Sequence, residues 1–458
     1  MHITPLTDRY YENIKELEEF CGEFALIKYR ILVESEYLIA LSDFGIMRTL
    51  SDEERNFLGG LCNSSDLDLV KKIERQGING KSPTYHDVRA VEEFIREKMN
   101  NSPLKDCTQW IHFALTSDDT NNLAYGLIHT NLINSVIFSC LNNLCDKIYE
   151  LADRWKYSVI LARTHGQVAS PTTFGKEFFV FYERLRKEME HLKSLEYDVK
   201  LNGAVGNYNA HYLAFPDKDW VSFSRNFVNK LSSKIDIRLS FNSVTTQIEP
   251  HDSFVRICDS LRRINNSLVD FSQDIWGYIS DGWLGQKQGD VKGFSYIGSS
   301  STMPHKLNPT DFENAEGNLI LANSLFEGFS RKLQISRFQR DLSDSTVFRN
   351  SILPFGFSLN AYKALLKGLS KIDINAKKID QVIDENPEVI AEGIQTMLRV
   401  LGYAQAYDLL KDFVRGKRVS LDELKGFISS LDIPQDVKNR LLDLNPRNYI
   451  GIADKLIL

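Results

Sequence analysis

Three long segments of the chain carry apolar residues at intervals of three and four positions. They run from 132 to 155, from 174 to 195 and from 257 to 279. This spacing places one apolar stripe along each helix, and no proline interrupts any of the three. Helices of roughly 25–30 residues far exceed the average of about 11–12. The pattern therefore predicts an elongated helical bundle.

The chain on either side of this bundle predicts shorter helices. Glycines interrupt the helical pattern up to about position 112, and again from about position 370 onward. No alternating segment is strong enough to build a sheet, and no internal repeat is visible. We therefore predict an all-α protein with three helical domains, at 1–112, 113–365 and 366–458, of which the central one is the long-helix bundle. Apolar stripes on such long helices also favour an oligomer.

Composition and charge narrow the class of protein. The 458 residues exceed one compact core, and 43% hydrophobic with 25% charged residues is an ordinary globular composition. A net charge of −6 argues against a general nucleic-acid binder, so an anionic ligand requires a local basic cluster. The six cysteines show neither disulfide nor zinc spacing. With no signal peptide and no apolar run of about 20 residues, we expect a cytoplasmic protein without a membrane partner.

The helical pattern breaks from position 282 onward. Glycines at 282, 285, 289 and 293 predict a long mobile loop over 282–302. Hydroxyls at 299–302 precede Lys306 and Asn308, and Pro309 starts a helix that bears Glu313. Hydroxyls, a cation and an amide between glycine hinges are typical of a lid that closes over an anion. A plain surface loop rich in Ser and Gly explains the composition equally well.

This loop also carries a motif. The residues Ser300-Ser301-Thr302-Met303-Pro304-His305-Lys306-Leu307-Asn308-Pro309 resemble the signature loop of the fumarase/aspartase superfamily. Within that superfamily, Asp8-Arg9-Tyr10 and the segments 245–252 and 340–347 make the chain most similar to the adenylosuccinate lyase family of the common bacterial type. The resemblance covers essentially the whole chain. It implies the same three-domain layout and a homotetramer whose active sites are each assembled from three chains.

The resemblance also implies an activity. Members of the family release fumarate by β-elimination from adenylosuccinate, giving AMP, and from the imidazole-carboxamide nucleotide SAICAR, giving AICAR. The implied substrate is an anionic purine nucleotide. No cofactor, metal or nucleic acid is expected to take part.

His165 is the candidate general acid. On the residues alone, it lies in a glycine-containing loop before Ser170-Pro171, a pattern that predicts a helix start, and an exposed histidine without a role is the favoured interpretation. The resemblance implies that His165 protonates the departing nitrogen and that Glu313 orients it.

The candidate base lies in the loop. Chemistry alone favours His305, whereas the resemblance implies Ser300, the serine six positions before Lys306, with the lysine stabilising its alkoxide. Ser299 stands where the superfamily usually has glycine. The choice between Ser300 and Ser301 therefore rests on counting alone.

Other patches suit the binding of an anion. Thr116 and Asp119 have the spacing of a capping box, and Arg340 and Arg349 suit bidentate phosphate recognition. Simple helix capping and a solvated charged face are the alternatives. The resemblance implies a substrate-binding set of Arg9, Tyr10, Tyr85, His86, Asp87, Thr116, Ser117, Gln247, Asn308, Asn314, Arg340, Ser345 and Arg349. The remaining histidines at 2, 129, 191, 211 and 251 are interpreted as structural.

Two other functions stay open. A sibling lyase would act on argininosuccinate, on fumarate and malate, or on aspartate, but a phosphate grip at Arg340 and Arg349 argues against it. A non-catalytic helical scaffold would be expected to lose His165, Ser300 or Lys306, and the sequence retains all of them.

Overall fold

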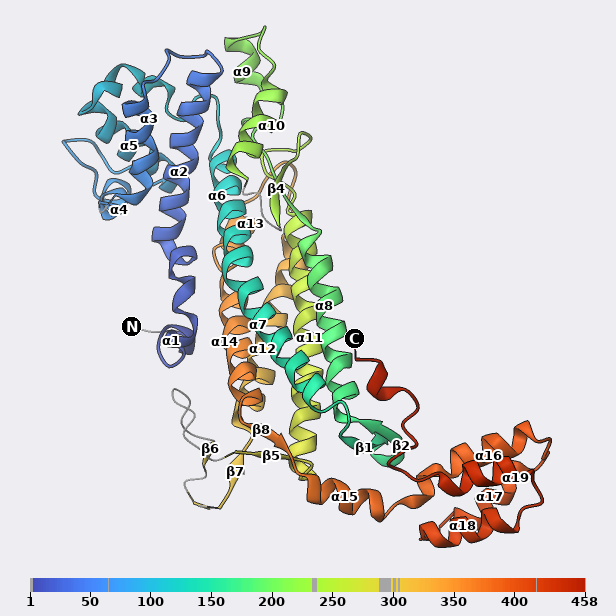
Figure 1. The fold of residues 1–458 in the computed structure, drawn as a ribbon. Helices are drawn as coiled ribbons and strands as arrows, with labels where there is room; N and C mark the ends of the chain where they lie inside the picture. The colour runs from blue at the N-terminus through green and yellow to red at the C-terminus, as the bar shows by residue number, and fades with distance from the viewer. Residues whose placement is uncertain are drawn as a thin grey trace. The chain divides into compact units, whose positions relative to one another are not determined.

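The computed structural model describes residues 3–64, 66–232, 237–287, 298–299, 302–303, 305–416 and 418–457. Most of the loop predicted to form a lid, including Ser300 and Ser301, lies outside these residues. The all-α prediction is confirmed, because helices make up most of the described chain and its strands form only two-stranded sheets (Figure 1).

The three segments with apolar stripes are helical. The first corresponds to a π-helical turn (Ile133–Ile137) and α7 (Phe138–Arg154), which continue α6 (Ser117–Leu132). The second corresponds to α8 (Phe174–Lys193) and the third to α11 (Asp252–Ser280). Along these stripes, Leu144, Phe178 and Leu268 are almost completely buried. Two further long helices, α12 (Thr310–Lys332) and α14 (Leu353–Leu369), follow in the chain. As predicted, α12 begins directly after Pro309.

One helical stretch of the described chain, Ser117–Arg154, has the length and apolar composition of a membrane span. However, 67% of its apolar window is buried inside the protein, which is the burial of a core helix.

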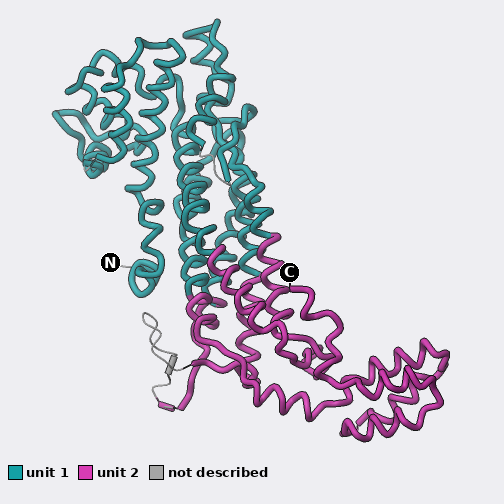
Figure 2. The backbone as a smooth tube through the Cα atoms, viewed as in Figure 1, with its two compact units in different colours: residues 1–141, 188–266, 317–363 teal, residues 142–187, 267–316, 364–458 magenta. Residues whose placement is uncertain are grey.

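The described chain separates into two compact units (Figure 2). Unit 1 comprises residues 1–141, 188–266 and 317–363, and unit 2 comprises 142–187, 267–316 and 364–458. Each unit thus combines segments that lie far apart in the sequence. The division at 1–112, 113–365 and 366–458 stays a prediction.

Unit 1 has a helical core near its N-terminus. It packs α2 (Gly22–Asp43), α3 (Asp52–Gly60), α4 (Asp68–Arg75) and α5 (Asp87–Asn100) around buried residues such as Phe94. The expectation of only short helices here is wrong for α2, which has 22 residues. Gly22 has φ +77° and lies at the start of α2, so this glycine opens the helix rather than breaking one.

Shorter elements complete unit 1. They are α1 (Tyr11–Ile14), α9 (Asn209–Ala214), α10 (Trp220–Leu231), α13 (Ser343–Phe348) and the parallel pair β3 (Glu196–Val199) and β4 (Arg238–Phe241).

Unit 2 contains an antiparallel hairpin where the sequence predicts a helix start. Ser170 and Pro171 lie in β2 (Gln167–Thr173), which pairs with β1 (Val159–Thr164), and the following helix begins only at Phe174. The prediction is wrong because a two-stranded sheet tolerates proline, which needs no ladder donor at an edge. Two further strands lie in the region 282–302, which was predicted to be loop. They are β5 (Leu284–Gln286), which pairs with β8 (Ile372–Ile374), and β6 (Gly298–Ser299), which pairs with β7 (Leu307–Asn308).

The C-terminal part of unit 2 is a cluster of short helices. They are α15 (Ala376–Asp384), α16 (Ala391–Val400), α17 (Ala406–Val414), α18 (Leu421–Ser430) and α19 (Gln435–Asp443). Buried side chains such as Leu398 and Leu424 form the core of the cluster.

Candidate active site

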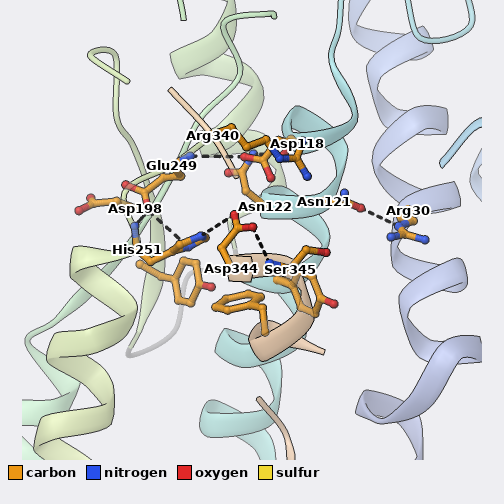
Figure 3. A pocket seen from close by; sticks show the side chains of 13 residues that line it. Arg30, Asp118, Asn121, Asn122, Asp198, Glu249, His251, Arg340, Asp344 and Ser345 are labelled. Atoms are coloured by element: carbon orange, nitrogen blue, oxygen red, sulfur yellow. Dashed lines mark hydrogen bonds and ion pairs between the residues drawn. The ribbon is translucent and has the colours of Figure 1, made fainter. Parts of the chain in front are cut away.

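A small cavity, lined mostly by polar and charged residues, lies within unit 1 (Figure 3). Its free volume of about 20 Å³ is close to room for one water molecule. The polar side chains around it come from five parts of the chain: Arg30 of α2; Asp118, Asn121 and Asn122 of α6; Asp198 of β3; Glu249 and His251; and Arg340, Asp344 and Ser345. Of these residues, only Arg340 and Ser345 were predicted to bind substrate. The structure thus places both beside a buried cluster of charged groups.

The carboxylates of this cluster have shifted pKa values. Burial raises the pKa of Glu249 to about 7, although the adjacent His251 acts against it. Burial also raises the pKa of Asp118, whose Oδ2 accepts a 3.3 Å hydrogen bond from the amide of Glu249. Shifts of this kind are typical of functional sites, although structural networks produce them too.

A second cluster joins predicted residues that lie far apart in the sequence. Arg349 Nη2 donates to Asp87 Oδ2 at 2.7 Å, across a separation of 262 positions. Arg30, which is buried, donates to the same oxygen at 2.8 Å. His86 Nε2 lies 3.4 Å from the hydroxyl of Ser117. The structure therefore brings Asp87 together with Arg349, and the neighbouring His86 together with Ser117. Residues of one binding site must lie close together in this way.

Asp87 is held as a carboxylate by two guanidinium groups. Burial by itself would raise the pKa of Asp87, but the charges and hydrogen bonds of Arg30 and Arg349 outweigh it and lower the pKa to about 2. Glu23 Oε2 also lies 3.6 Å from Arg349 Nη1, so two carboxylates face the two guanidinium groups. In addition, Nη1 of Arg30 is buried and has no hydrogen-bond partner among the described residues.

The start of α6 is fixed by a buried ion pair. The amide of Thr116 donates to Asp119 Oδ2 at 2.8 Å, which confirms the predicted capping box. Asp119 Oδ1 in turn accepts from Lys200 Nζ at 2.6 Å, and both side chains are 0% exposed. The amides of Asn202 and Gly203 donate to Asp119 as well. This network holds Thr116 and Ser117 in place.

His112 lies just before this helix and is held between acidic side chains. Its Nδ1 is 2.7 Å from Glu34 Oε1, which also accepts a hydrogen bond from Thr120, and its Nε2 is 3.9 Å from Glu92. Burial by itself would lower the pKa of His112, but these carboxylates outweigh it and raise the pKa to about 9.

This shift predicts a loss of stability at alkaline pH. An unfolded histidine titrates near 6.5, so the contribution of His112 is fully present below about pH 6.5 and is lost as the pH rises through about 9. We expect the thermal unfolding midpoint to fall more over this window in the wild type than in the double variant His112→Gln/Glu34→Gln, which lacks the titrating pair. Equal falls in the two proteins would contradict the assignment.

The other predicted residues of unit 1 contribute less to these clusters. Tyr85 is 80% exposed and has φ +49°, a strained conformation for a tyrosine. Arg9 is exposed, whereas Tyr10 and Gln247 are half-buried.

Unit 2 carries the predicted catalytic residues. His165 is exposed at the turn between β1 and β2 and has φ +53°. Strained backbone of this kind costs about 1–3 kcal/mol and clusters at functional sites. Lys306 is exposed, Asn308 lies in β7, and Glu313 and Asn314 lie in the first turns of α12. Ser300 lies outside the described residues.

Glu313 has a partner that the sequence did not suggest. Its Oε1 accepts a 3.1 Å hydrogen bond from the indole Nε1 of Trp276 on α11. Its predicted role in orienting His165 is therefore not seen within this single chain.

Several residues of the cavity were missed by sequence reasoning. Glu249 and His251 lie in the family-like segment 245–252, and Asp344 lies in 340–347, so the motif itself carried the signal. Arg30 lies in α2 outside every motif, and only tertiary contact reveals it. Within the described chain, no group of three or more His, Cys, Asp or Glu residues could hold a metal ion.

Solved structures with this fold define the class. The chain resembles a fumarate lyase from Mesorhizobium sp. BNC1 with a TM-score of 0.73 at 15% identity, covering 97% of this chain and 96% of the other. It resembles a 3-carboxy-cis,cis-muconate lactonizing enzyme from Pseudomonas putida with a TM-score of 0.71 at 19% identity, covering 99% and 97%. The chain therefore shares the fold of these two enzymes.

Sequence comparison narrows this class to one family. The family model described as Lyase matches residues 79–322, and the one described as Adenylosuccinate lyase C-terminal matches residues 336–450. The adenylosuccinate lyases of Legionella pneumophila (strain Corby) and Escherichia coli (strain K12) are 43% and 39% identical to the chain, each over 99% of it and 97% of the relative. The relative in Dictyostelium discoideum is 42% identical over 98% of this chain and 96% of its own length. The chain belongs to the adenylosuccinate lyase family, which confirms the resemblance seen in the sequence.

Proposed function

We propose that this protein is a fumarate-releasing lyase of purine nucleotide biosynthesis, which cleaves adenylosuccinate to AMP and SAICAR to AICAR. The observation that carries the proposal is the 43% identity to an adenylosuccinate lyase over 99% of the chain. Arg340 and Arg349 of unit 1 support it as donors for an anionic group, because a chain of net charge −6 needs local guanidinium groups to bind a nucleotide.

The reaction is a β-elimination and needs three functions. A base removes a proton from the carbon next to a carboxylate, the C–N bond breaks, and an acid protonates the departing nitrogen. After the proton is removed and before the C–N bond breaks, the carboxylate carries a second negative charge and needs a cation and hydrogen-bond donors. We assign Ser300 as the base, His165 as the acid, and Lys306 with Asn308 as the stabilising groups.

The remaining catalytic assignment is Glu313, whose role is to orient His165. The exposure of His165, Lys306 and Glu313 supports a site that is completed by assembly, because each of these side chains is available to a second copy of the chain.

The substrate-binding set is assigned as the sequence predicts: Arg9, Tyr10, Tyr85, His86, Asp87, Thr116, Ser117, Gln247, Asn308, Asn314, Arg340, Ser345 and Arg349. The contacts of Asp87 with Arg349 and of His86 with Ser117 support it. Arginine and serine together suit a phosphate group, because a guanidinium binds two of its oxygens at once.

A homotetramer with shared active sites completes the proposal. Ile320 and Leu321 on the long helix α12 are 48% and 53% exposed, which supports burial against another copy. A cytoplasmic location is supported by the six cysteines, none of which forms a disulfide in the described structure.

Fumarate formation by the purified protein tests this function. We expect turnover of both adenylosuccinate and SAICAR, and much slower release of fumarate from argininosuccinate, malate or aspartate, which lack the nucleotide phosphate. Faster turnover of one of these three would identify a sibling lyase. No turnover of any substrate would favour the non-catalytic scaffold.

A further inference from the structure

The short helix α13 has two buried residues, Asp344 and Phe348, and His251 contacts both. The Nε2 atom of His251 lies 3.9 Å from Asp344 Oδ2, a distance that allows an ion pair but is too long for a hydrogen bond. Its ring stacks on Phe348 with 4.9 Å between centroids and 27° between planes. Asp344 and Phe348 are four positions apart and share one face of the helix. One imidazole therefore touches both buried side chains of α13.

The same segment carries proposed substrate contacts. Ser345 lies in α13, Arg340 precedes it and Arg349 follows it directly. The orientation of all three depends on how α13 is held. Phe348 also packs against Tyr125 and Phe254, at 4.5 and 5.0 Å between ring centroids, so α13 has other apolar anchors. On its buried face, Asp344 forms the ion pair with His251 and is also attracted by the charge of Arg340.

The backbone conformation and the contacts of His251 with Glu249 fix the orientation of the His251 ring. His251 has φ +64°, a strained conformation for a non-glycine residue. Glu249 Oε2 accepts a 2.6 Å hydrogen bond from the amide of His251 and lies 4.0 Å from its Nδ1. Burial by itself would lower the pKa of His251, but the carboxylates of Asp344, Glu249 and Asp118 outweigh the effect of burial and raise this pKa. The raised pKa favours a charged ring between the carboxylates.

We propose that His251 is a positioning residue, which fixes α13 through Asp344 and Phe348 and so orients Arg340, Ser345 and Arg349 toward the substrate phosphate. This inference rests on the proposed function, because those three residues bind phosphate only in that assignment. The phosphate does not react, so its contacts contribute equally to the ground state and the transition state. Their loss should raise KM and leave kcat nearly unchanged.

Initial rates against adenylosuccinate concentration test this role in the full-length protein. We expect His251→Gln and Asp344→Asn each to raise KM about tenfold with kcat within about twofold. Because Asp344 acts through His251, the double variant should be no worse than His251→Gln. His251→Phe, which keeps the stacking but not the ion pair, should raise KM as Asp344→Asn does and no more than His251→Gln does.

The controls separate positioning from simple stability. His211 is also buried and packs on Trp220 at 4.8 Å between ring centroids. We expect His211→Asn to lower the thermal midpoint and leave KM unchanged. A wild-type KM in folded Asp344→Asn, or additive effects in the double variant, would overturn the proposal even if His251→Gln failed to fold. Absence of wild-type turnover would instead reject the function.

Discussion

Replacing His165 with alanine is expected to lower kcat on adenylosuccinate by about 10²- to 10⁴-fold, the usual contribution of a positioned general acid. The side chain is exposed at a hairpin turn, so its removal leaves no buried group unpaired. The size of the oligomer and the thermal midpoint should therefore stay as in the wild type. Steady-state rates and size-exclusion chromatography measure the two properties.

The matched control is His191→Ala, which removes another exposed histidine, on α8. It should keep wild-type kcat. Wild-type kcat in His165→Ala would remove this residue from the mechanism.

The same assay assigns the base: we expect Ser300→Ala to be inactive, and full activity in it would transfer the role to Ser301 or His305.

Replacing Lys200 with methionine is expected to cost about 3–5 kcal/mol of the free energy of unfolding. Lys200 is the cation paired with Asp119, and both side chains are fully buried. Without it, Asp119 keeps hydrogen bonds from backbone amides but has no countercharge in a site that water does not reach. Denaturant unfolding at fixed protein concentration, which removes the effect of oligomerisation, measures the loss.

A surface pair provides the control for this variant. Lys187 lies 3.7 Å from Glu183, with side chains that are 71% and 31% exposed. Lys187→Met should cost at most about 1 kcal/mol, because solvent screens such pairs. In the double variant Lys200→Met/Asp119→Asn, the removal of both charges should recover part of the loss. A Lys200→Met loss no larger than that of Lys187→Met would show that the buried pair contributes little.

Local patterns predicted the elements whose signals lie within a few residues. The apolar stripes predicted the long helices, Pro309 predicted the start of α12, and Thr116 with Asp119 predicted a capped start of α6. These signals depend on side chains three or four positions apart, which the helix itself brings together. Where two local structures share a signal, prediction was wrong: Ser170-Pro171 suits a helix start, and the chain uses it in an edge strand.

The sequence by itself determined the all-α class, the long helices and the family, because the loop motif and the segments around it are contiguous residues that can be read directly. Only the tertiary structure decided which side chains meet. Asp87 and Arg349 are 262 positions apart and share an ion pair, and Arg30 reaches the same carboxylate from a helix without any motif. His251, interpreted as structural, lines the cavity and contacts α13. Such contacts arise from the packing of one helix on another, and no periodicity along the chain encodes that geometry.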